Sequence, residues 1–298
     1  MIKKFLLIVN VLIIVLSVPV STFGQKLLFL KDSNSLGQKQ FVLNNNISTY
    51  EIINQGSFVT DEVLDEGRLK KEVIKHFPNI KSEGYGVLDW EGLAMETLVH
   101  QKDIKKLDFY IGQFVRALKI VKSMRPLVKW SFYALPFRSY NIFNESFIQK
   151  NYRLAEIIKE QDFIAPSLYI FYIDDSAKTA NSKYIQKNIK LALEMGQRFG
   201  KPVYPFIWQR VHPNNKINGD QLVPIPVFKN EIAEILNVKY NNKKVSGLIW
   251  WHAENYFYAN RAKSKAYAKE YLDIKDVDSY QRDMFQMYYN SIKNYLNK

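Results

Sequence analysis

Two carboxyl groups in the segment GYGVLDWEG, residues 84–92, have the type and spacing of an acid–base pair. Asp89 and Glu91 stand two positions apart at the end of an apolar run that is typical of a buried strand. Side chains at positions i and i+2 of a strand point to the same face, about 6.6 Å apart. Carboxyl groups that close raise each other's proton affinity, so that one stays protonated near neutral pH. A protonated acid beside an ionised partner is what cleavage of a glycosidic bond requires.

A purely structural role for the pair remains open at this point. Glu91 directly precedes residues 92–98, and a carboxylate there would stabilise the first turn of a helix electrostatically. Trp90, between the two acids, is expected to point the other way, toward a layer of helices. The spacing alone is therefore compatible with catalysis and with helix capping.

The elements that must position these residues alternate along the chain. Apolar, β-branched runs predict strands at residues 47–53, 85–90, 129–135, 164–172, 202–208 and 245–251. Helical patterns lie between them, at residues 104–121, where Pro126 follows, at 184–199, which Gly200 stops, and at 261–271. This alternation, without a glycine-rich phosphate loop after any strand, predicts an α/β fold. We expect a distorted (β/α) TIM-like barrel in a single domain, and no nucleotide cofactor.

Polar and aromatic residues cluster where five of the predicted strands end. The segments are DWE (89–91), YALPFRSYN (133–141), YIFYIDD (169–175), WQRVH (208–212) and WWHAEN (250–255). Catalytic groups of such barrels project from the C-terminal ends of the strands, so these segments predict an active-site rim. The candidates for substrate binding are Tyr133, Tyr140, Asn141, Trp208, Arg210, Trp250 and Glu254.

Several of these candidates also have ordinary structural interpretations. Tyr169 has a phenol that can hydrogen-bond a sugar, or it is a core tyrosine with a satisfied hydroxyl. Trp250 and Trp251 are adjacent and must face opposite sides, so at most one of them lines the barrel mouth. Glu254 either positions substrate or caps the helix that follows it.

The sequence lacks the motifs of metal-dependent enzymes and of serine hydrolases. The chain has no cysteine, and its four histidines show no HxH or HExxH spacing. No GxSxG nucleophile elbow occurs. We therefore expect neither a metal site nor a cofactor.

The N-terminal segment predicts export. Lys3 and Lys4 precede an apolar run over residues 5–18, and small residues follow, with cleavage expected before Gln25. Residues 1–24 are thus predicted to be a signal peptide, and residues 25–298 the barrel domain. The mature chain would be periplasmic or secreted, without a stable membrane span.

The net charge of +13 suggests the type of partner. An exported basic protein rarely meets nucleic acid, so an anionic polysaccharide is the expected partner. We expect the protein to act on it as a monomer.

An ordered series of segments resembles one family, the hyaluronidases of animals and venoms. GYGVLDWEG is similar to that family's catalytic strand, and RALKIVKSMRPLVKWSFYALPFRSYN to its next helix, strand and loop. IAPSLYI, KPVYPFIW and VSGLIWWHAEN resemble three later strands, and residues 262–273 the helix that follows. The resemblance covers roughly residues 47–273.

The resemblance implies a mechanism. The family is a distorted (β/α) barrel that cleaves β-linked N-acetylhexosamine within glycosaminoglycans and retains configuration with the help of the substrate's acetamido group. By this likeness Glu91 would be the acid and then the base, and Asp89 would orient the acetamido group. Tyr169 would hydrogen-bond near the reacting centre, and Trp250 would wall the pocket.

The departures from the family leave two alternatives. The family's disulfide cysteines are absent, and its Pro-Asp-Cys-Tyr-Asn loop here reads PFRSYN. Phe58 lacks the hydroxyl of the tyrosines that the family has in this segment. Arg210–Val211 replaces the family's aromatic Phe-Tyr pair. One alternative is a non-catalytic glycan-binding barrel. The other is a glycosidase on another polysaccharide that pairs Glu91 with a carboxylate from a separate strand, Asp174 or Glu254.

Overall fold

The computed structural model describes residues 24–32, 34–100, 102–263 and 268–296. The predicted signal peptide, apart from Gly24, lies outside the described residues. Within them, no helix combines the length and the apolar character needed to cross a bilayer.

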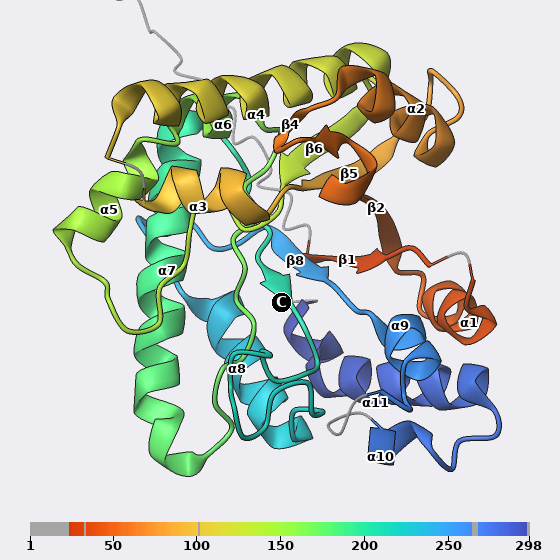
Figure 1. Ribbon diagram of the computed structural model, residues 1–298. Helices are drawn as coiled ribbons and strands as arrows, with labels where there is room; N and C mark the ends of the chain where they lie inside the picture. The colour runs from red at the N-terminus through yellow and green to blue at the C-terminus, as the bar shows by residue number, and fades with distance from the viewer. Residues whose placement is uncertain (1–23, 33, 101, 264–267, 297–298) are drawn as a thin grey trace, which may run out of the picture.

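A sheet of six parallel strands forms the centre of the molecule (Figure 1). Its order is β6-β5-β2-β1-β8-β7. The strands are β1 (Lys26–Leu30), β2 (Ser48–Asn54), β5 (Gly84–Asp89), β6 (Val128–Phe132), β7 (Phe206–Ile207) and β8 (Gly247–Trp250). Parallel strands need covered faces, and helices occupy most of the connections between them.

Residues 164–168 join the two edges of this sheet. Ile164 and Ser167 make parallel bridges to Val203 and Phe206, and Ala165 makes an antiparallel bridge to Leu135. The sheet thereby curls into a barrel, because the chain beyond β6 and the chain at β7 contact the same segment.

Helices surround the sheet (Figure 1). The long ones are α2 (Glu66–His76), α4 (Ile104–Met124), α7 (Lys178–Phe199), α8 (Ile225–Asn237) and α11 (Val277–Leu296), and α1 (Leu36–Asn44) packs on α11. Shorter elements are α3 (Gly92–His100), α5 (Glu145–Tyr152), α6 (Ala155–Glu160), α9 (Glu254–Ala259), α10 (Ala268–Tyr271), and the hairpin β3 (Val59–Thr60) and β4 (Val63–Leu64).

Alternation along each strand divides the core into two parts. Phe29, Trp90 and Trp250 point outward and pack between the sheet and the helices. Leu28 and Ile249 point inward and fill the barrel interior. The direction predicted for Trp90 is confirmed, because it packs against Phe58 and Phe114 of the outer layer.

The predicted barrel class is confirmed, with local differences. Four predicted strands appear as β2, β5, β6 and β8, whereas 202–208 keeps only two strand residues and 164–172 forms isolated bridges. Pro166, Pro202 and Pro205 lack the amide hydrogen that a regular ladder needs. β1 was not predicted, since its five residues directly follow the apolar N-terminal segment. The helix predicted at 261–271 is described at its two ends, where residues 261–263 form a turn and Ala268–Tyr271 is helical.

Candidate active site

A cavity of about 530 Å³ opens where the strands end. Asn54, Asp89 and Glu91 line it from the ends of β2 and β5. Trp208, Asp220 and Trp251 line it from the segments that follow β7 and β8. The cavity therefore lies at the face of the barrel where the sequence predicts catalytic groups.

Asp89 is a half-buried residue with one buried, unsatisfied carboxyl oxygen. It ends β5, paired in register with Asn54 of β2. Its Oδ1 is buried and has no hydrogen-bond partner among the described residues. Burial, and secondarily the charge of Glu91, raises the pKa of Asp89 to about 7. A carboxyl group with a raised pKa and an unpartnered oxygen can accept a proton or a hydrogen bond from a substrate.

Glu91 stands at the mouth of the same cavity. Its backbone N–H donates to Oε1 of Gln55 over 2.8 Å, which ties the end of β5 to the segment after β2. Although the residue is exposed, desolvation by its surroundings raises the pKa of its carboxyl, and the charge of Arg138 opposes that shift. Both acids thus bind protons more readily than they would in water, which suits a group that must donate a proton near neutral pH.

Tyr133 and Tyr169 line the cavity as neighbouring phenols. Their rings stack with centroids 6.2 Å apart, and the Tyr133 hydroxyl donates to Ser167 Oγ over 3.1 Å. Tyr169 also stacks on Trp251, at 5.9 Å, and contacts Trp208. Burial raises the pKa of both phenols, so they remain neutral hydrogen-bond donors at ordinary pH.

Arg138 and His212 form a polar pair beside Tyr169 that the sequence analysis did not select. Arg138 Nη2 lies 2.7 Å from His212 Nε2, and its guanidinium lies over the ring of Tyr169, 5.6 Å from the centroid. Burial and the charge of Arg138 lower the pKa of His212 to about 4, so the ring is neutral. The sequence signal for Arg138 was its place in PFRSYN, directly after a strand.

Trp250 does not lie in the cavity. It is fully buried among Phe29, Phe228 and Phe285, and its Nε1 donates to Gln209 Oε1 over 2.7 Å. Ile249 points into the barrel, so alternation sends Trp250 outward to the helices and Trp251 inward. The cavity wall expected from Trp250 is provided by Trp251.

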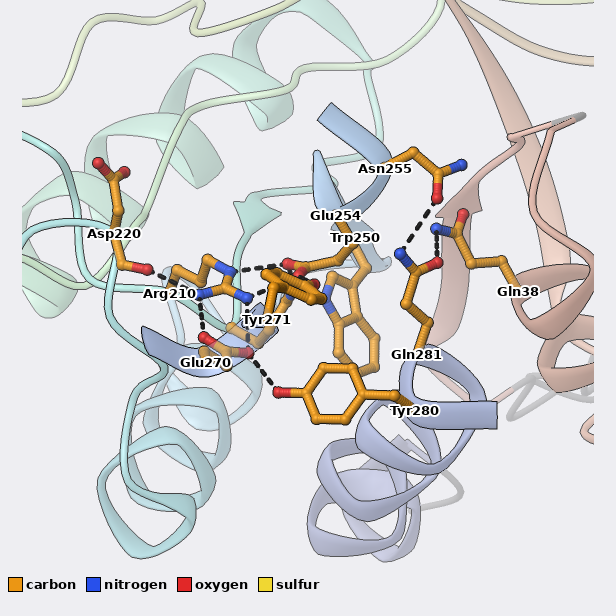
Figure 2. A network of polar contacts seen from close by, with 11 residues as sticks. Gln38, Arg210, Asp220, Trp250, Glu254, Asn255, Glu270, Tyr271, Tyr280 and Gln281 are labelled. Carbon is orange, nitrogen blue, oxygen red and sulfur yellow. Dashed lines mark hydrogen bonds and ion pairs between the residues drawn. The ribbon is translucent and has the colours of Figure 1, made fainter. Parts of the chain in front are cut away.

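Arg210 and Glu254 are also absent from the cavity lining. Both are fully buried and form an ion pair, with Nη2 of Arg210 2.6 Å from Oε2 of Glu254 (Figure 2). Glu270 and the hydroxyl of Tyr271 complete this network. Because each charge already has its partners, these two residues have a structural role instead of the predicted contact with substrate.

Tyr140 and Asn141 lie to one side of the cavity. The Tyr140 hydroxyl donates to Oδ1 of Asn181 on α7 over 2.7 Å, and Asn141 is exposed. Asp174, an alternative partner for Glu91, lines a separate cavity of about 280 Å³ with residues of α7 and α8. The structure thus gathers Asp89, Glu91, Tyr133, Tyr169 and Trp208, and leaves the remaining candidates outside.

In the described part of the chain, no group of three or more His, Asp and Glu side chains is arranged to hold a metal ion.

No protein-family model matches the chain, and no curated protein matches it. Several solved structures match the chain. The chain is similar to a monoclinic crystal structure of bee venom hyaluronidase, with a TM-score of 0.64, 15% identity, and coverage of 92% of this chain and 100% of that chain. The same venom enzyme in complex with a hyaluronic acid tetramer gives a TM-score of 0.62 at 15% identity, covering 92% and 98%. The likeness establishes a hyaluronidase-like barrel.

Proposed function

We propose that the cavity is the active site of a glycoside hydrolase, on a chain whose fold is similar to that of bee venom hyaluronidase. The substrate is a polysaccharide, cleaved internally at a β-linked N-acetylhexosamine. The observation that carries this proposal is the joint position of Asp89 and Glu91 at one cavity, where Asp89 has a buried, unpartnered oxygen and Glu91 stands at the mouth.

In the first step, protonated Glu91 gives its proton to the glycosidic oxygen. The acetamido carbonyl oxygen of the same sugar attacks C1 as the bond from C1 to the leaving oxygen breaks. Asp89 accepts a hydrogen bond from the acetamido N–H and stabilises the positive charge that develops on the ring. Its buried, unpartnered Oδ1 supports this role.

In the second step, ionised Glu91 takes a proton from water as the water oxygen attacks C1. The bond from C1 to the acetamido oxygen breaks, and the acetamido group is restored. Two displacements at C1 retain its configuration. The neutral phenol of Tyr169 is a hydrogen-bond donor at the cavity wall, suited to the acetamido carbonyl.

The positions of the other acids support a nucleophile from the substrate. Asp174 lines a different cavity, and Glu254 is buried in its ion pair with Arg210. Neither of the two alternative nucleophiles that the sequence offered lines the cavity beside Glu91.

Glu91→Gln tests the proposal. With a β-linked N-acetylhexosamine oligosaccharide, the variant should lose about a hundred- to ten-thousandfold in kcat, measured as release of reducing ends, because amide cannot donate the proton. Glu96→Gln is the matched control, since Glu96 is exposed on α3. Full turnover by Glu91→Gln with an unchanged fold would refute the acid role.

A thiazoline mimic of the cyclised acetamido intermediate tests the nucleophile. We expect competitive inhibition of the wild-type protein. A glycosidase that uses its own carboxylate as the nucleophile would be insensitive, and a non-catalytic glycan-binding barrel would bind oligosaccharides without releasing reducing ends.

Export is also part of the proposal. β1 begins at Lys26, directly after the expected cleavage site, and the Gln25 side chain donates to the carbonyls of Leu236 and Val245. A mature chain that starts at Gln25 would thus keep every strand of the barrel. N-terminal sequencing of protein secreted by the native host checks this, and a retained Met1 would contradict it.

A further inference from the structure

The charged groups that line the active-site cavity are acids. Asp89, Glu91 and Asp220 contribute carboxyl groups, and the described lining residues include no lysine or arginine. His212 also lines the cavity, and its imidazole stays neutral above about pH 4 because its pKa is lowered to about 4. A sugar that enters the cavity therefore meets negative charge whenever these carboxyl groups are ionised.

A buried network holds Asp220 at the cavity wall (Figure 2). Its backbone has φ 67°, in the left-handed region, its N–H donates to the Val211 carbonyl over 2.9 Å, and its own carbonyl accepts from Arg210 Nη1 over 2.8 Å. Glu254 and Glu270 fix that arginine in turn. The network thus binds the main chain of Asp220 and not its acid group.

The carboxyl group of Asp220 is left for the cavity. Figure 2 shows it pointing away from Arg210. Within the described residues, no hydrogen bond or ion pair engages its side-chain oxygens. Burial raises its pKa, and the charge of Arg210 opposes the shift. An acid supported in this way is a ready acceptor for a hydroxyl or amide of a ligand.

Trp208 forms part of the same cavity wall. It is only 3% exposed, it lines the cavity, and its Nε1 has no hydrogen-bond partner among the described residues. That Nε1 atom is buried, as are the unpartnered Nε1 atoms of Trp90 and Trp130 in the outer core, so Trp208 contributes its indole ring to the wall. The wall formed after β7 thus offers an indole ring, from Trp208, and a hydrogen-bond acceptor, from Asp220.

We propose that Asp220 makes this cavity selective for N-acetylhexosamine polymers without acid groups. A chain of β-linked N-acetylglucosamine would pack a sugar ring against Trp208 and donate hydrogen bonds to Asp220 from its hydroxyl and acetamido groups. A polymer that alternates the amino sugar with a uronic acid would bring a carboxylate toward a wall that already carries one, which costs binding energy. This inference rests on the proposed function and reverses the expectation of an anionic substrate drawn from net charge.

The net charge of +13 does not oppose this selectivity. It acts at long range and influences how often a charged polymer meets the protein. Selection at the cavity depends on the nearby charges: Asp89, Glu91 and Asp220 line it, and Arg138, which lies over Tyr169, offsets part of the charge of Glu91.

Binding to the Glu91→Gln protein tests the inference without requiring turnover. Isothermal titration calorimetry would compare N-acetylglucosamine oligosaccharides with hyaluronan oligosaccharides of equal length. We expect at least about tenfold tighter binding of the neutral sugar. Adding Asp220→Asn should narrow that ratio to within about threefold, and Asp220→Lys should reverse it. Asp174→Asn, at the separate cavity, is the matched control and should keep the ratio.

Three results would overturn the inference: tighter binding of the hyaluronan oligosaccharide, a ratio that Asp220→Asn leaves unchanged, or no binding of either sugar. Failure of the proposed function is a separate result. In that case wild-type protein would cleave neither sugar, while the selectivity of binding and its dependence on Asp220 could persist.

Discussion

Trp250 and Trp251 are consecutive residues that face opposite sides of the barrel wall. Trp250 packs outward against Phe29 and Phe285, and Trp251 lines the cavity beside Tyr169. The end of β8 and the residue after it therefore contribute one indole to the fold and the other to the candidate active site.

This division predicts opposite phenotypes for the two tryptophans. Trp250→Ala should lower the free energy of unfolding by about 3–5 kcal/mol, because it leaves a large cavity in the core. Trp251→Ala should reduce kcat/KM by about tenfold or more with little effect on stability, because it removes a wall that positions the sugar. Urea denaturation and oligosaccharide kinetics check both. Equal stability losses in the two variants would contradict the assignment.

Asp89 should make the folded protein less stable as the pH rises. The pKa of Asp89 is about 7 in the folded protein and near its ordinary value of about 3.9 when unfolded. Between these values the unfolded chain has released a proton that the folded protein keeps, so raising the pH favours unfolding. Asp89→Asn should therefore be more stable than wild type by roughly 1–3 kcal/mol at pH 8, with a smaller gain at pH 4.

Chemical denaturation at several pH values measures this difference, with Glu96→Gln as a control for removal of a surface charge. A gain for Asp89→Asn that is the same at pH 4 and pH 8 would show that titration of Asp89 is not its cause.

Arg138 should set the upper pH limit of activity. Its charge lowers the pKa of Glu91 against the upward effect of desolvation. Arg138→Gln should thus raise the pKa of Glu91 and move the alkaline limb of the kcat/KM profile to higher pH, since Glu91 must be protonated to act as the acid. Arg138→Lys keeps the charge and should largely keep the wild-type profile. Identical shifts in both variants would point to lost packing on Tyr169 instead.

The pair of Arg210 and Glu254 should be essential to stability. Both side chains are fully buried, and loss of the Glu254 charge weakens the two hydrogen bonds that it accepts from Arg210, leaving Glu270 as the remaining carboxylate partner of that arginine. Glu254→Gln should cost about 3–5 kcal/mol in the free energy of unfolding. Lys31→Gln, which breaks an exposed ion pair with Glu51, is the control and should cost less than about 1 kcal/mol. Chemical denaturation of both variants decides between these outcomes.

Much of the candidate site could be predicted from local sequence. The spacing of Asp89 and Glu91 predicted two acids on one face, and the cavity contains both. Alternation also predicted that the two adjacent tryptophans diverge. It could not identify the inward one, because that depends on which neighbours of β8 face the barrel interior, as Ile249 does.

The incorrect predictions for Arg210 and Glu254, and the omission of Asp220, have a common physical cause. Arg210 and Glu254 follow strands and carry charge, which are the features that favoured a role in binding substrate. They meet each other because segments 44 residues apart converge at one buried point, and there the charges neutralise one another. No local pattern contains that contact. Asp220 was missed for the same reason, since its place at the cavity depends on the Arg210 network.

The sequence by itself determined the class of fold, the polar ends of the strands and the i, i+2 pair, because strand periodicity and apolar runs are local properties. Only the tertiary structure decided which strand-end residues share the cavity, because closure of the barrel brings β5 opposite β7 and β8. The same closure buries Arg210 and Glu254 as an ion pair, which removes both from the cavity lining.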